Sequence, residues 1–303
     1  MNDFKKKVVY QIYPKSFKDT NGTGTGDLKG VIEKLDYLQT LGVDYIWLTP
    51  FYVSPQNDNG YDVADYYNID PSYGTMEDVE NLIAEAKKRN IYLMMDMVFN
   101  HVSTEHIWFK KAMAGEEKYL NYFFFKQGKA NNQPPTNWNS KFGGPAWEYV
   151  EKFDKWYLHL FDKTQADLNW ENPKLRKEIY DMILWWMEKG AGGFRLDVID
   201  QIAKEPDQKI TNNGPRLHEF IRELSKETFQ KGNLITVGEA WGADTERAKL
   251  YSNPDGSEFS MVFQFEHMML DQEAGKEKWD FCPLPLSLMS GINAPIGIMG
   301  IIL

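Results

Sequence analysis

Short apolar runs alternate along the chain with longer segments in which apolar residues recur every three or four positions. Six of the runs are compact and rich in β-branched or aromatic residues, as buried strands are. These six runs lie at 7–14, 43–50, 91–101, 192–200, 234–241 and 260–267. The longer segments have the period of amphipathic helices and lie at 28–42, 76–90, 172–190 and 214–232. The alternation predicts a parallel sheet with crossover helices.

Polar residues gather at the C-terminal ends of the predicted strands, which favours a barrel over an open sheet. We therefore expect an α/β fold, a (β/α)8 TIM barrel of which this chain supplies about six strands. The pattern breaks after the third strand, where residues 102–167 are rich in Asn, Pro, Gly and Trp. A structureless loop of that length is unusual in a compact domain, so we expect a small inserted subdomain there. The barrel would then occupy residues 1–101 and 168–280.

The last residues, 281–303, contain no Asp, Glu, Lys or Arg, in a protein that is 26% charged. Pro, Gly, Ser and Asn interrupt this apolar tail too often for a membrane span. We expect the tail to supply neither of the two strands that would complete the barrel. Because a six-stranded remnant exposes unpaired edges, we expect the chain as printed to be at best marginally folded.

Composition and charge narrow the choice of partners. The formal net charge is −10, which argues against nucleic acid or an anionic membrane, because no basic surplus exists to offset phosphates. Aromatic residues make up 15% of the chain, and their flat faces suit sugar rings as well as a large core. The single cysteine, Cys282, excludes an intramolecular disulfide, and the first residues include no long apolar signal segment. These features lead us to expect a cytoplasmic protein.

Charged residues occupy three of the predicted strand ends. Arg195 and Asp197 are two apart in one strand and therefore share a face, while Asp96 and Glu239 end the strands on either side. We expect the guanidinium to keep Asp197 ionised, and apolar neighbours to keep Glu239 protonated. One charged and one neutral carboxyl is the arrangement of a retaining glycosidase. A lone Arg-x-Asp pair is more often a structural ion pair, and only the joint occurrence on successive strands favours catalysis.

Several segments together resemble the α-amylase superfamily of glycoside hydrolases. Three of them, "DMVFNH", "GFRLDVID" and "VGEAW", are similar to ordered signature regions of that superfamily. Other segments resemble its oligo-1,6-glucosidase and dextran glucosidase branch, and they lie at 8–30, 57–66, 165–173 and 261–267. The resemblance extends from about residue 7 to about residue 280.

The resemblance implies catalytic roles for three residues. Asp197 matches the nucleophile, Glu239 the general acid/base, and Arg195 the arginine that orients the nucleophile. Val198 matches members that prefer α-1,6 bonds, because maltose-preferring relatives tend to have alanine there. The implied activity is that of a retaining α-glucosidase that removes terminal glucose from short oligosaccharides, with the α-1,4 bond as a further candidate. We expect the full-length form to be a monomer.

The resemblance also implies a pocket for the terminal glucose. His101, Gln165 and Asp58 match residues of this pocket, and Asp58 is expected to bind sugar hydroxyls. Tyr61 matches an aromatic residue that stacks on the sugar ring. For Tyr61 and Gln165, ordinary loop packing is the alternative without the resemblance. Two supporting residues, Asp96 and Asn100, are expected to fix the end of the third strand.

Residues 19–27 place oxygen-bearing side chains at alternate positions among glycines, a spacing that suits Ca²⁺. The donors are Asp19, Asn21, Thr23, Thr25 and Asp27. The superfamily binds Ca²⁺ through matching positions, with Thr25 contributing its backbone carbonyl. Thr23 occupies a position where relatives commonly have aspartate. The resemblance therefore implies a weak structural Ca²⁺ site, with a plain turn as the alternative.

The family places a third carboxylate in an Asn-His-Asp motif on the seventh strand, and this sequence contains no such motif. We interpret the chain as a truncated product that lacks strands seven and eight and the C-terminal β-domain, and we expect it to be inactive. Trehalose-6-phosphate hydrolase is the alternative enzyme and would need a cationic phosphate pocket. A non-catalytic amylase-like protein that binds sugar or a partner is the alternative class, which the intact pair of Asp197 and Glu239 opposes.

Overall fold

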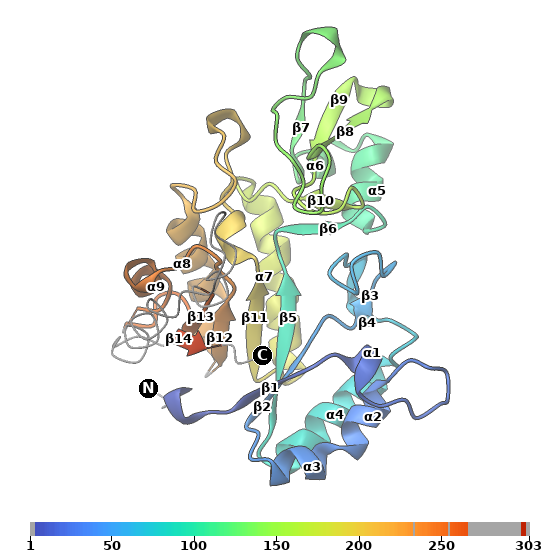
Figure 1. Ribbon diagram of the computed structural model, residues 1–303, viewed down its shortest axis with the longest axis vertical. Coiled ribbons are helices and arrows are strands. Elements are labelled where there is room, and N and C mark those ends of the chain that lie inside the picture. The colour runs from blue at the N-terminus through green and yellow to red at the C-terminus, as the bar shows by residue number, and fades with distance from the viewer. Residues whose placement is uncertain (1–3, 233, 254, 266–297, 301–303) are drawn as a thin grey trace, which may run out of the picture.

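A computed structural model describes residues 4–232, 234–253, 255–265 and 298–300. Its central sheet has parallel strands in the order β1-β2-β5-β11-β12-β13-β14 (Figure 1). The bounds are β1 Val9–Ile12, β2 Tyr45–Leu48, β5 Tyr92–Val98, β11 Gly193–Asp197, β12 Ile235–Gly238, β13 Met261–Gln264 and β14 Ile298–Gly300. The first six correspond to the six apolar runs, so the sequence prediction of these strands and of their parallel arrangement is confirmed.

The short strand β14 corrects the expectation that the apolar tail adds no strand. It pairs in parallel with β13, and Val262 lies opposite Ile298 in the register. Parallel strands that are covered on both faces read as continuous apolar runs, so an uncharged run such as this one is compatible with a strand. Residues 281–297 and 301–303 of the tail lie outside the described residues. Within the described ranges β1 and β14 each pair with one neighbour, which leaves a half-barrel open between them.

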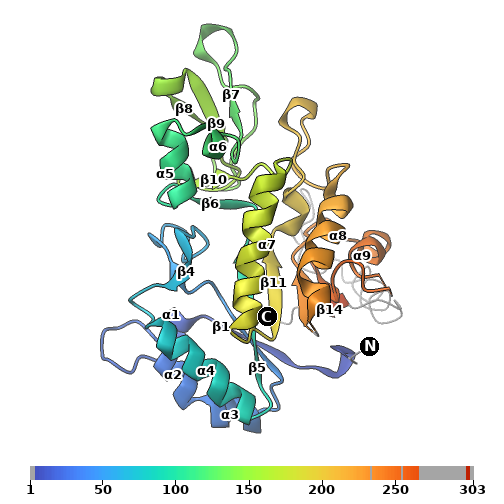
Figure 2. The ribbon, with the colours of Figure 1, turned by 180° about the vertical axis from the view of Figure 1, so that it is seen from behind.

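Helices cover the outer face of the half-barrel, and Figure 2 shows α7 and α8 in front of β11. The helices are α1 Pro14–Phe17, α2 Leu28–Glu33, α3 Leu35–Thr40, α4 Met76–Lys88, α5 Ile107–Ala114, α6 Glu117–Leu120, α7 Pro173–Glu188, α8 Leu217–Glu227 and α9 Thr245–Tyr251. Short 3₁₀ helices are η1 Phe4–Lys6, η2 Ala130–Asn132, η3 Glu151–Phe153, η4 Ile199–Gln201, η5 Pro206–Gln208 and η6 Phe229–Lys231. In the part of the chain that is described, no helix has the length and apolarity needed to span a membrane.

Local sequence explains where the longer helices begin. A capping box opens α4, in which the Thr75 hydroxyl accepts the Asp78 N–H and the Asp78 carboxylate accepts the Thr75 N–H. The Asn172 side chain caps α7, and Pro173 fills the first helical position, where no N–H is needed. The amphipathic segment at 28–42 forms two helices rather than one, because Lys34 leaves helical geometry with φ −102° and ψ 3°.

The two faces of the sheet have different surroundings. The outer face packs under the helices in the main core, to which Leu48, Met95 and Leu196 belong. The inner face carries a smaller apolar cluster of Tyr45, Trp47, Met94, Ile235, Val237, Met261, Phe263 and Phe265. The parallel register places Arg195 beside Val237 on this inner face. Charged groups therefore adjoin an apolar layer inside the half-barrel, toward the C-terminal ends of its strands.

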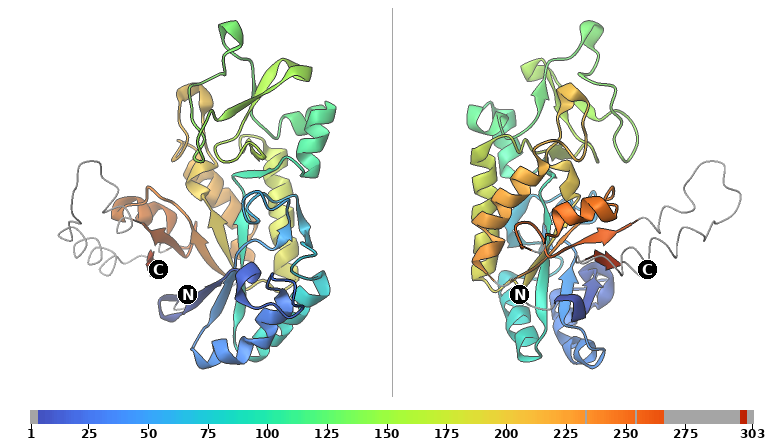
Figure 3. Two further views of the ribbon diagram at one scale, coloured as in Figure 1. Left: turned by 45° about the vertical axis from the view of Figure 1, so that its right-hand side comes forward. Right: turned by 90° about the vertical axis from the view of Figure 1, so that its left-hand side faces the viewer.

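The segment between β5 and α7 carries its own small sheets. Strand β6 His101–Ser103 pairs antiparallel with β10 Gln165–Asp167 and closes the segment at its base. Between them, β7 Phe125–Lys126, β8 Trp147–Val150 and β9 Lys155–Leu158 form a sheet in the order β7-β9-β8. A separate hairpin pairs β3 Tyr52–Val53 with β4 Asp65–Ile69. Both views in Figure 3 show the β7-β9-β8 sheet beyond the C-terminal end of β5, which is the end that carries the candidate site.

Candidate active site

Adjacent strand ends bring the predicted charged residues together. In the register, Arg195 of β11 lies opposite Asp96 of β5, and Asp197 lies opposite Val98. On the other side, Arg195 lies opposite Val237 of β12, two residues before Glu239. Parallel strands present their C-terminal ends at one edge of the sheet, so these carboxylates converge on the arginine.

The Arg195 guanidinium joins three carboxylates, which we call the carboxylate cluster. Nη1 donates to Asp96 Oδ1 at 2.8 Å and to Asp197 Oδ1 at 2.6 Å, while Nη2 donates to Glu239 Oε2. The guanidinium also lies over the Trp47 ring, 5.1 Å from its centroid, which adds a cation–π contact. One cation therefore fixes the side chains of all three acids. Arg195 and Asp197, which are two residues apart in β11, contact each other through Nη1.

The electrostatics of Asp197 differ from the expectation drawn from the sequence. Burial raises the pKa of Asp197 well above its ordinary value, Arg195 opposes this shift, and the charges of Glu239 and Asp96 add to it. Burial likewise raises the pKa of Asp96, against the influence of Arg195. Arg195 acts on Asp197 in the predicted direction, by lowering its pKa, but burial and the two neighbouring carboxylates outweigh this influence, so the net shift is upward. The reason is that one buried guanidinium is divided among three carboxylates and cannot compensate all of them.

The surroundings of Glu239 are also more polar than expected. Its Oε2 accepts the Val198 N–H at 3.0 Å in addition to the Arg195 contact, and its Oε1 accepts the indole N–H of Trp241 at 3.0 Å. The prediction of an apolar wall around Glu239 is thus wrong. Residues with largely apolar side chains supply N–H groups there, namely the backbone N–H of Val198 and the indole N–H of Trp241. Val198 can present its N–H because its backbone is left-handed, with φ 34° and ψ 46°, a strained conformation for a β-branched residue.

The residues predicted for the terminal glucose pocket lie beside the cluster. Gln165 Nε2 donates to Asp58 Oδ2 at 2.9 Å and lies 3.1 Å from His101 Nε2. The Tyr61 hydroxyl donates to Asp96 Oδ2 at 3.1 Å, while its backbone carbonyl accepts from His101 Nε2 at 3.2 Å. Tyr61 therefore connects the pocket to the cluster.

Buried groups set the protonation state of this pocket. Asn100 Nδ2 lies 3.0 Å from His101 Nδ1. The tautomer in which Nδ1 accepts from this amide places the proton on Nε2, toward the Tyr61 carbonyl. Burial lowers the pKa of His101 to about 4, which makes the imidazole neutral at physiological pH. Burial raises the pKa of Asp58, and the hydrogen bond from Gln165 opposes this change. The pocket thus offers both donors and acceptors to a ligand.

Three residues around the site were not predicted. Trp47 donates from Nε1 to Asp96 Oδ2 at 2.9 Å, and its position at the end of an apolar run was the available signal. Lys204 forms a buried ion pair with Asp167 at 2.8 Å and donates to Asn100 Oδ1 at 2.7 Å. No spacing in the sequence relates Lys204 to either partner. Trp241 donates from its indole to Glu239, and an indole N–H two residues after a carboxyl is a visible signal.

The loop at residues 19–27 is separate from the carboxylate cluster and lies between α1 and α2. Asp19 Oδ1 accepts the N–H groups of Asn21 and Gly22 at 2.8 Å each, and Oδ2 accepts that of Gly24 at 2.7 Å. These backbone hydrogen bonds, led by that of Gly24, lower the pKa of Asp19. The Thr23 hydroxyl donates to the Thr25 carbonyl at 3.2 Å. Backbone amides thus hold an ionised carboxylate at the start of the loop.

At the other end of the loop, Asp27 is already well satisfied by protein donors. Its Oδ1 accepts the Gly30 N–H at 2.7 Å and caps α2, and its Oδ2 accepts the Thr20 N–H at 2.9 Å. Burial acts to raise the pKa of Asp27, but hydrogen bonds from Thr20 and Gly30 outweigh it and lower the pKa overall. In the described ranges, no group of three or more His, Cys, Asp or Glu residues has the arrangement of a metal site. Asp19 and Asp27 are therefore the only carboxylates that this loop offers a cation.

Comparison with known proteins identifies relatives of the whole described fold. Residues 11–291 match the catalytic domain of the alpha-amylase family. The trehalose-6-phosphate hydrolase of Bacillus subtilis is 52% identical over 292 residues, which cover 92% of this chain and 52% of that protein. The glucan 1,6-alpha-glucosidase of Streptococcus pneumoniae is 54% identical over 275 residues, which cover 90% of this chain and 50% of that protein. The crystal structure of Bacillus licheniformis trehalose-6-phosphate hydrolase superposes with a TM-score of 0.91 at 48% identity, covering 98% of this chain and 56% of that one.

These similarities confirm the family and the barrel class expected from the motifs. An oligo-1,6-glucosidase is also among the relatives, in agreement with the branch suggested by the sequence. The chain spans about half the length of the curated relatives it matches, and the half-barrel sheet is the corresponding part of their (β/α)8 catalytic domain. The chain belongs to the alpha-amylase family of glycoside hydrolases.

Proposed function

We propose that the protein is a retaining α-glucosidase that removes terminal glucose from short α-linked oligosaccharides and prefers the α-1,6 bond. The observation that carries this proposal is the single Arg195 side chain that holds Asp197 and Glu239 at neighbouring strand ends. A retaining glycosidase needs two carboxyl groups that are close together and flank one bond. A shared guanidinium fulfils the first of these conditions.

In the proposed first step, a carboxylate oxygen of Asp197 bonds to the anomeric carbon while the glycosidic C–O bond breaks, and Glu239 gives its proton to the departing oxygen. In the second step, Glu239 takes a proton from water, whose oxygen bonds to the anomeric carbon and releases Asp197. The chemistry requires one charged and one protonated carboxyl. A buried cluster of three carboxyls and one guanidinium favours a bound proton, because it cannot compensate three negative charges.

The terminal glucose is proposed to bind in the pocket beside the cluster. Asp58 and Gln165 would hydrogen-bond its hydroxyls, and neutral His101 would donate from Nε2 once a sugar oxygen replaces the Tyr61 carbonyl. Tyr61 offers its ring face to the sugar, next to Arg195, whose guanidinium carbon lies 5.7 Å from the ring centroid. Because His101 and Gln165 are buried, the proposed site suits the end of a sugar chain rather than its middle.

The second sugar is proposed to bind against Trp241. The indole is 47% exposed, although it stacks on Phe265 with ring centroids 4.2 Å apart and planes 4° from parallel. A flat, exposed ring fixed beside the proton donor is a suitable surface for a sugar. Val198 adjoins the same region through its hydrogen bond to Glu239, and its branched side chain supports the proposed preference for the α-1,6 bond.

We also propose a weak structural Ca²⁺ site in the loop at residues 19–27. The donor set is all oxygen, as Ca²⁺ requires, and its two carboxylates have lowered pKa values and remain charged. The candidate ligands are Asp19, Asn21, Thr23, the Thr25 carbonyl and Asp27. Because protein donors already satisfy Asp27, the ion would add little to the fold. Its role would be to hold the loop between α1 and α2, away from the chemistry.

Trehalose-6-phosphate hydrolase activity is the second candidate, because a protein with this name is 52% identical to the chain. It requires a cationic site for the phosphate near the second sugar. Asp200 argues against such a site, because this buried acid follows the proposed nucleophile by three residues and is close enough to Glu239 for their charges to interact. We further propose that the protein acts as a monomer in the cytoplasm, in line with its single cysteine.

The test uses a completed barrel, in which residues 1–280 are joined to the part of the S. pneumoniae relative that follows its matched region. With a chromogenic α-glucoside, Asp197→Asn should lower kcat by several orders of magnitude and leave the thermal transition in place. Asp44→Asn, a change at a surface ion pair with Lys7, is the matched control and should retain activity. Near-normal turnover by the Asp197→Asn barrel would remove the basis of the proposal.

A further inference from the structure

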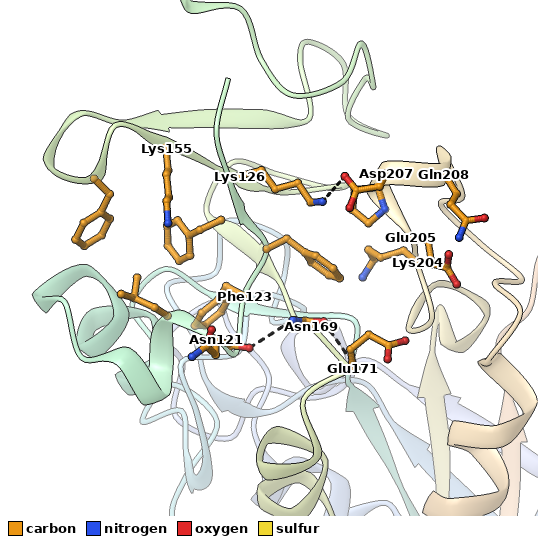
Figure 4. Close-up of a pocket in the computed structure, with 15 residues that line it drawn as sticks. Asn121, Phe123, Lys126, Lys155, Asn169, Glu171, Lys204, Glu205, Asp207 and Gln208 are labelled. Atoms are coloured by element: carbon orange, nitrogen blue, oxygen red, sulfur yellow. Dashed lines mark hydrogen bonds and ion pairs between the residues drawn. The ribbon is translucent and has the colours of Figure 1, made fainter. Parts of the chain in front are cut away.

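We propose that a second pocket, separate from the carboxylate cluster, is an accessory binding site for a neutral sugar. The pocket lies between β7, the residues that follow β10, and the connection from β11 to α8 (Figure 4). Its volume is about 570 Å³, within the range of roughly 300–1,000 Å³ that small-molecule sites occupy. None of the catalytic or terminal-glucose residues lines it, so it is a distinct cavity.

One side of the pocket is aromatic. Phe123, Phe124, Phe125 and Phe153 line it, and all except Phe123 are only partly buried. Phe125 and Phe153 are fixed edge to face, with centroids 5.9 Å apart and planes 86° apart. Rigid ring faces that remain accessible can stack against the C–H face of a pyranose.

The opposite side is polar and has unused hydrogen-bonding capacity. Figure 4 shows Glu205 and Gln208 on the β11–α8 connection, across the pocket from Lys155 and Asn121. Within the described ranges, the side chains of Glu205 and Gln208 form no hydrogen bond or ion pair with another residue. They therefore provide an acceptor and an amide group that hydroxyls of a ligand can engage.

The charges of the lining exclude a strongly ionic ligand. Lys126 pairs with Asp207 at 2.5 Å across the pocket, and Lys204 pairs with Asp167 at 2.8 Å. Glu171, a third lining acid, pairs with Arg216. Of the charges left, Lys155 and Glu205 have opposite signs. A phosphate would need uncompensated cations, and an ammonium ligand would need uncompensated acids. A neutral molecule with one apolar face and many hydroxyls, such as a sugar, fits both sides.

The pocket shares a residue with the framework of the proposed active site. Lys204 lies under Phe124, with Nζ 5.6 Å from the ring centroid, and the same ammonium holds Asn100, the hydrogen-bond partner of His101. Binding in the pocket would thus occur next to the network that fixes the terminal glucose pocket. For this reason Lys204 is unsuitable as a test position, whereas Glu205 and Gln208 do not contact that network.

The experiment measures binding of radiolabelled isomaltose to the 303-residue chain by equilibrium dialysis, with Asp197→Asn present to prevent turnover. The neutral, ring-stacking character of the ligand is inferred from the lining, and the choice of isomaltose rests on the proposed function. Glu205→Ala with Gln208→Ala should weaken binding at one site by about tenfold or more, because hydrogen bonds to the sugar are lost. The matched control is Gln39→Ala with Glu188→Ala, two exposed positions outside the pocket, and it should bind like the parent.

Further variants make each outcome decisive. His101→Ala tests the terminal glucose pocket alone. If it abolishes one class of site while the pocket variant abolishes another, both assignments hold. If only the pocket variant loses binding, the accessory site stands and the proposed glucose pocket fails. Equal binding by the parent and the pocket variant, or no binding by either, would overturn the accessory site. If the double substitution unfolds the chain by circular dichroism, Gln208→Leu alone is compared with Gln39→Leu in its place.

Discussion

The carboxylate cluster around Arg195 and the loop at residues 19–27 hold their acids in opposite ways. In the cluster, three carboxyls share one buried guanidinium, and burial raises the pKa of Asp197. In the loop, backbone amides surround the partly exposed Asp19 and lower its pKa. The cluster requires three strands in register, whereas the loop requires only a short turn.

This difference shows what each arrangement contributes. A turn that satisfies its own carboxylate through nearby amides is stable locally and gains little from the rest of the fold. A buried cluster with one cation for three acids is costly and depends on the whole sheet, as strained and charged groups at functional sites commonly are. The left-handed backbone at Val198, with φ 34°, is a second such cost at the same place. Changes in the cluster should therefore have larger effects than changes in the loop.

The largest effect is expected from Arg195→Gln. Removing the cation leaves three buried carboxyls without a cationic partner, and breaking a buried ion pair costs about 3–5 kcal/mol. Urea unfolding of the chain at pH 7.5 measures this loss. The loss should shrink as the pH approaches 4, because protonation removes the uncompensated charges. Arg89→Gln, at a surface network with Asp36 and Glu85, is the control and should cost less than about 1 kcal/mol. Equal losses for the two arginines would contradict the claim that the cluster depends on its buried cation.

The next effect concerns the dependence of stability on pH. Asp200 is buried with an unpartnered Oδ1 among the described residues, and burial raises its pKa from 3.8 to about 7. The folded state therefore binds this proton more tightly, so stability falls as the pH rises from about 4 to about 7 and the loss is complete above 7. At about 1.4 kcal/mol for each tenfold change in proton affinity, the loss is at most about 4 kcal/mol. Asp200→Asn should remove it and stabilise the chain at pH 8 but not at pH 4.

Asp19→Asn is the matched change in the loop and should behave with the opposite sign. The pKa of Asp19 is lowered in the folded state, so its charged form stabilises the fold above an ordinary pKa of 3.8, and this stabilisation disappears as the pH falls below that value. Asp19→Asn should therefore destabilise the chain slightly at pH 7, and this effect should diminish as the pH falls below 3.8. Thermal melting between pH 3 and pH 8 measures both variants. If the stability of the two variants changed with pH in the same direction, the opposite pKa shifts of Asp19 and Asp200 would be contradicted.

A smaller effect is expected on linkage preference. In the completed barrel, Val198→Ala should lower the ratio of kcat/KM for isomaltose to that for maltose, because the branched side chain next to the nucleophile shapes the second sugar site. Discrimination by a single group of this size is worth about 1–3 kcal/mol, or about 10–200-fold. Ile199→Val, directly after it in the buried core, is the control and should leave the ratio unchanged. An unchanged ratio in Val198→Ala would show that Val198 does not determine the linkage preference.

The smallest effect is expected from Ca²⁺. A site with a dissociation constant of about 1 mM would add about 1.4 kcal/mol at 10 mM Ca²⁺, which is a small rise in Tm. Differential scanning fluorimetry with Ca²⁺, with Mg²⁺ and with chelator measures it, and Asp19→Asn should abolish the rise. A Tm that does not respond to Ca²⁺ in the parent chain would leave the loop as a plain turn.

The strands and the meeting of Arg195 with Asp197 could be predicted from the sequence. Apolar runs are recognisable, and a spacing of two in a strand places side chains on one face. The contacts of Glu239 could not be predicted in the same way. Its bond to the Val198 N–H depends on one left-handed residue, and a β-branched residue gives no signal of that conformation.

The protonation of the site was also beyond sequence reasoning, because it depends on how many acids share one cation. The sequence shows Asp96 and Glu239 at neighbouring strand ends but not that both bind the arginine that Asp197 uses. The same holds for Lys204, whose partners come from distant elements. Strand β14 was missed for another reason, since a short run without alternation suits a buried parallel strand as well as an irregular tail.

The most direct test of the proposed active site is to trap the glycosyl intermediate on the completed barrel with a 5-fluoro-α-glucosyl fluoride. Such a reagent forms the covalent intermediate and slows its hydrolysis, so peptide mass spectrometry locates the modified carboxyl. We predict one sugar per chain, on the peptide that contains Asp197, and none in Asp197→Asn. An adduct on Asp96 or Glu239, or an active barrel that forms no adduct on Asp197, would contradict the assignment of the nucleophile.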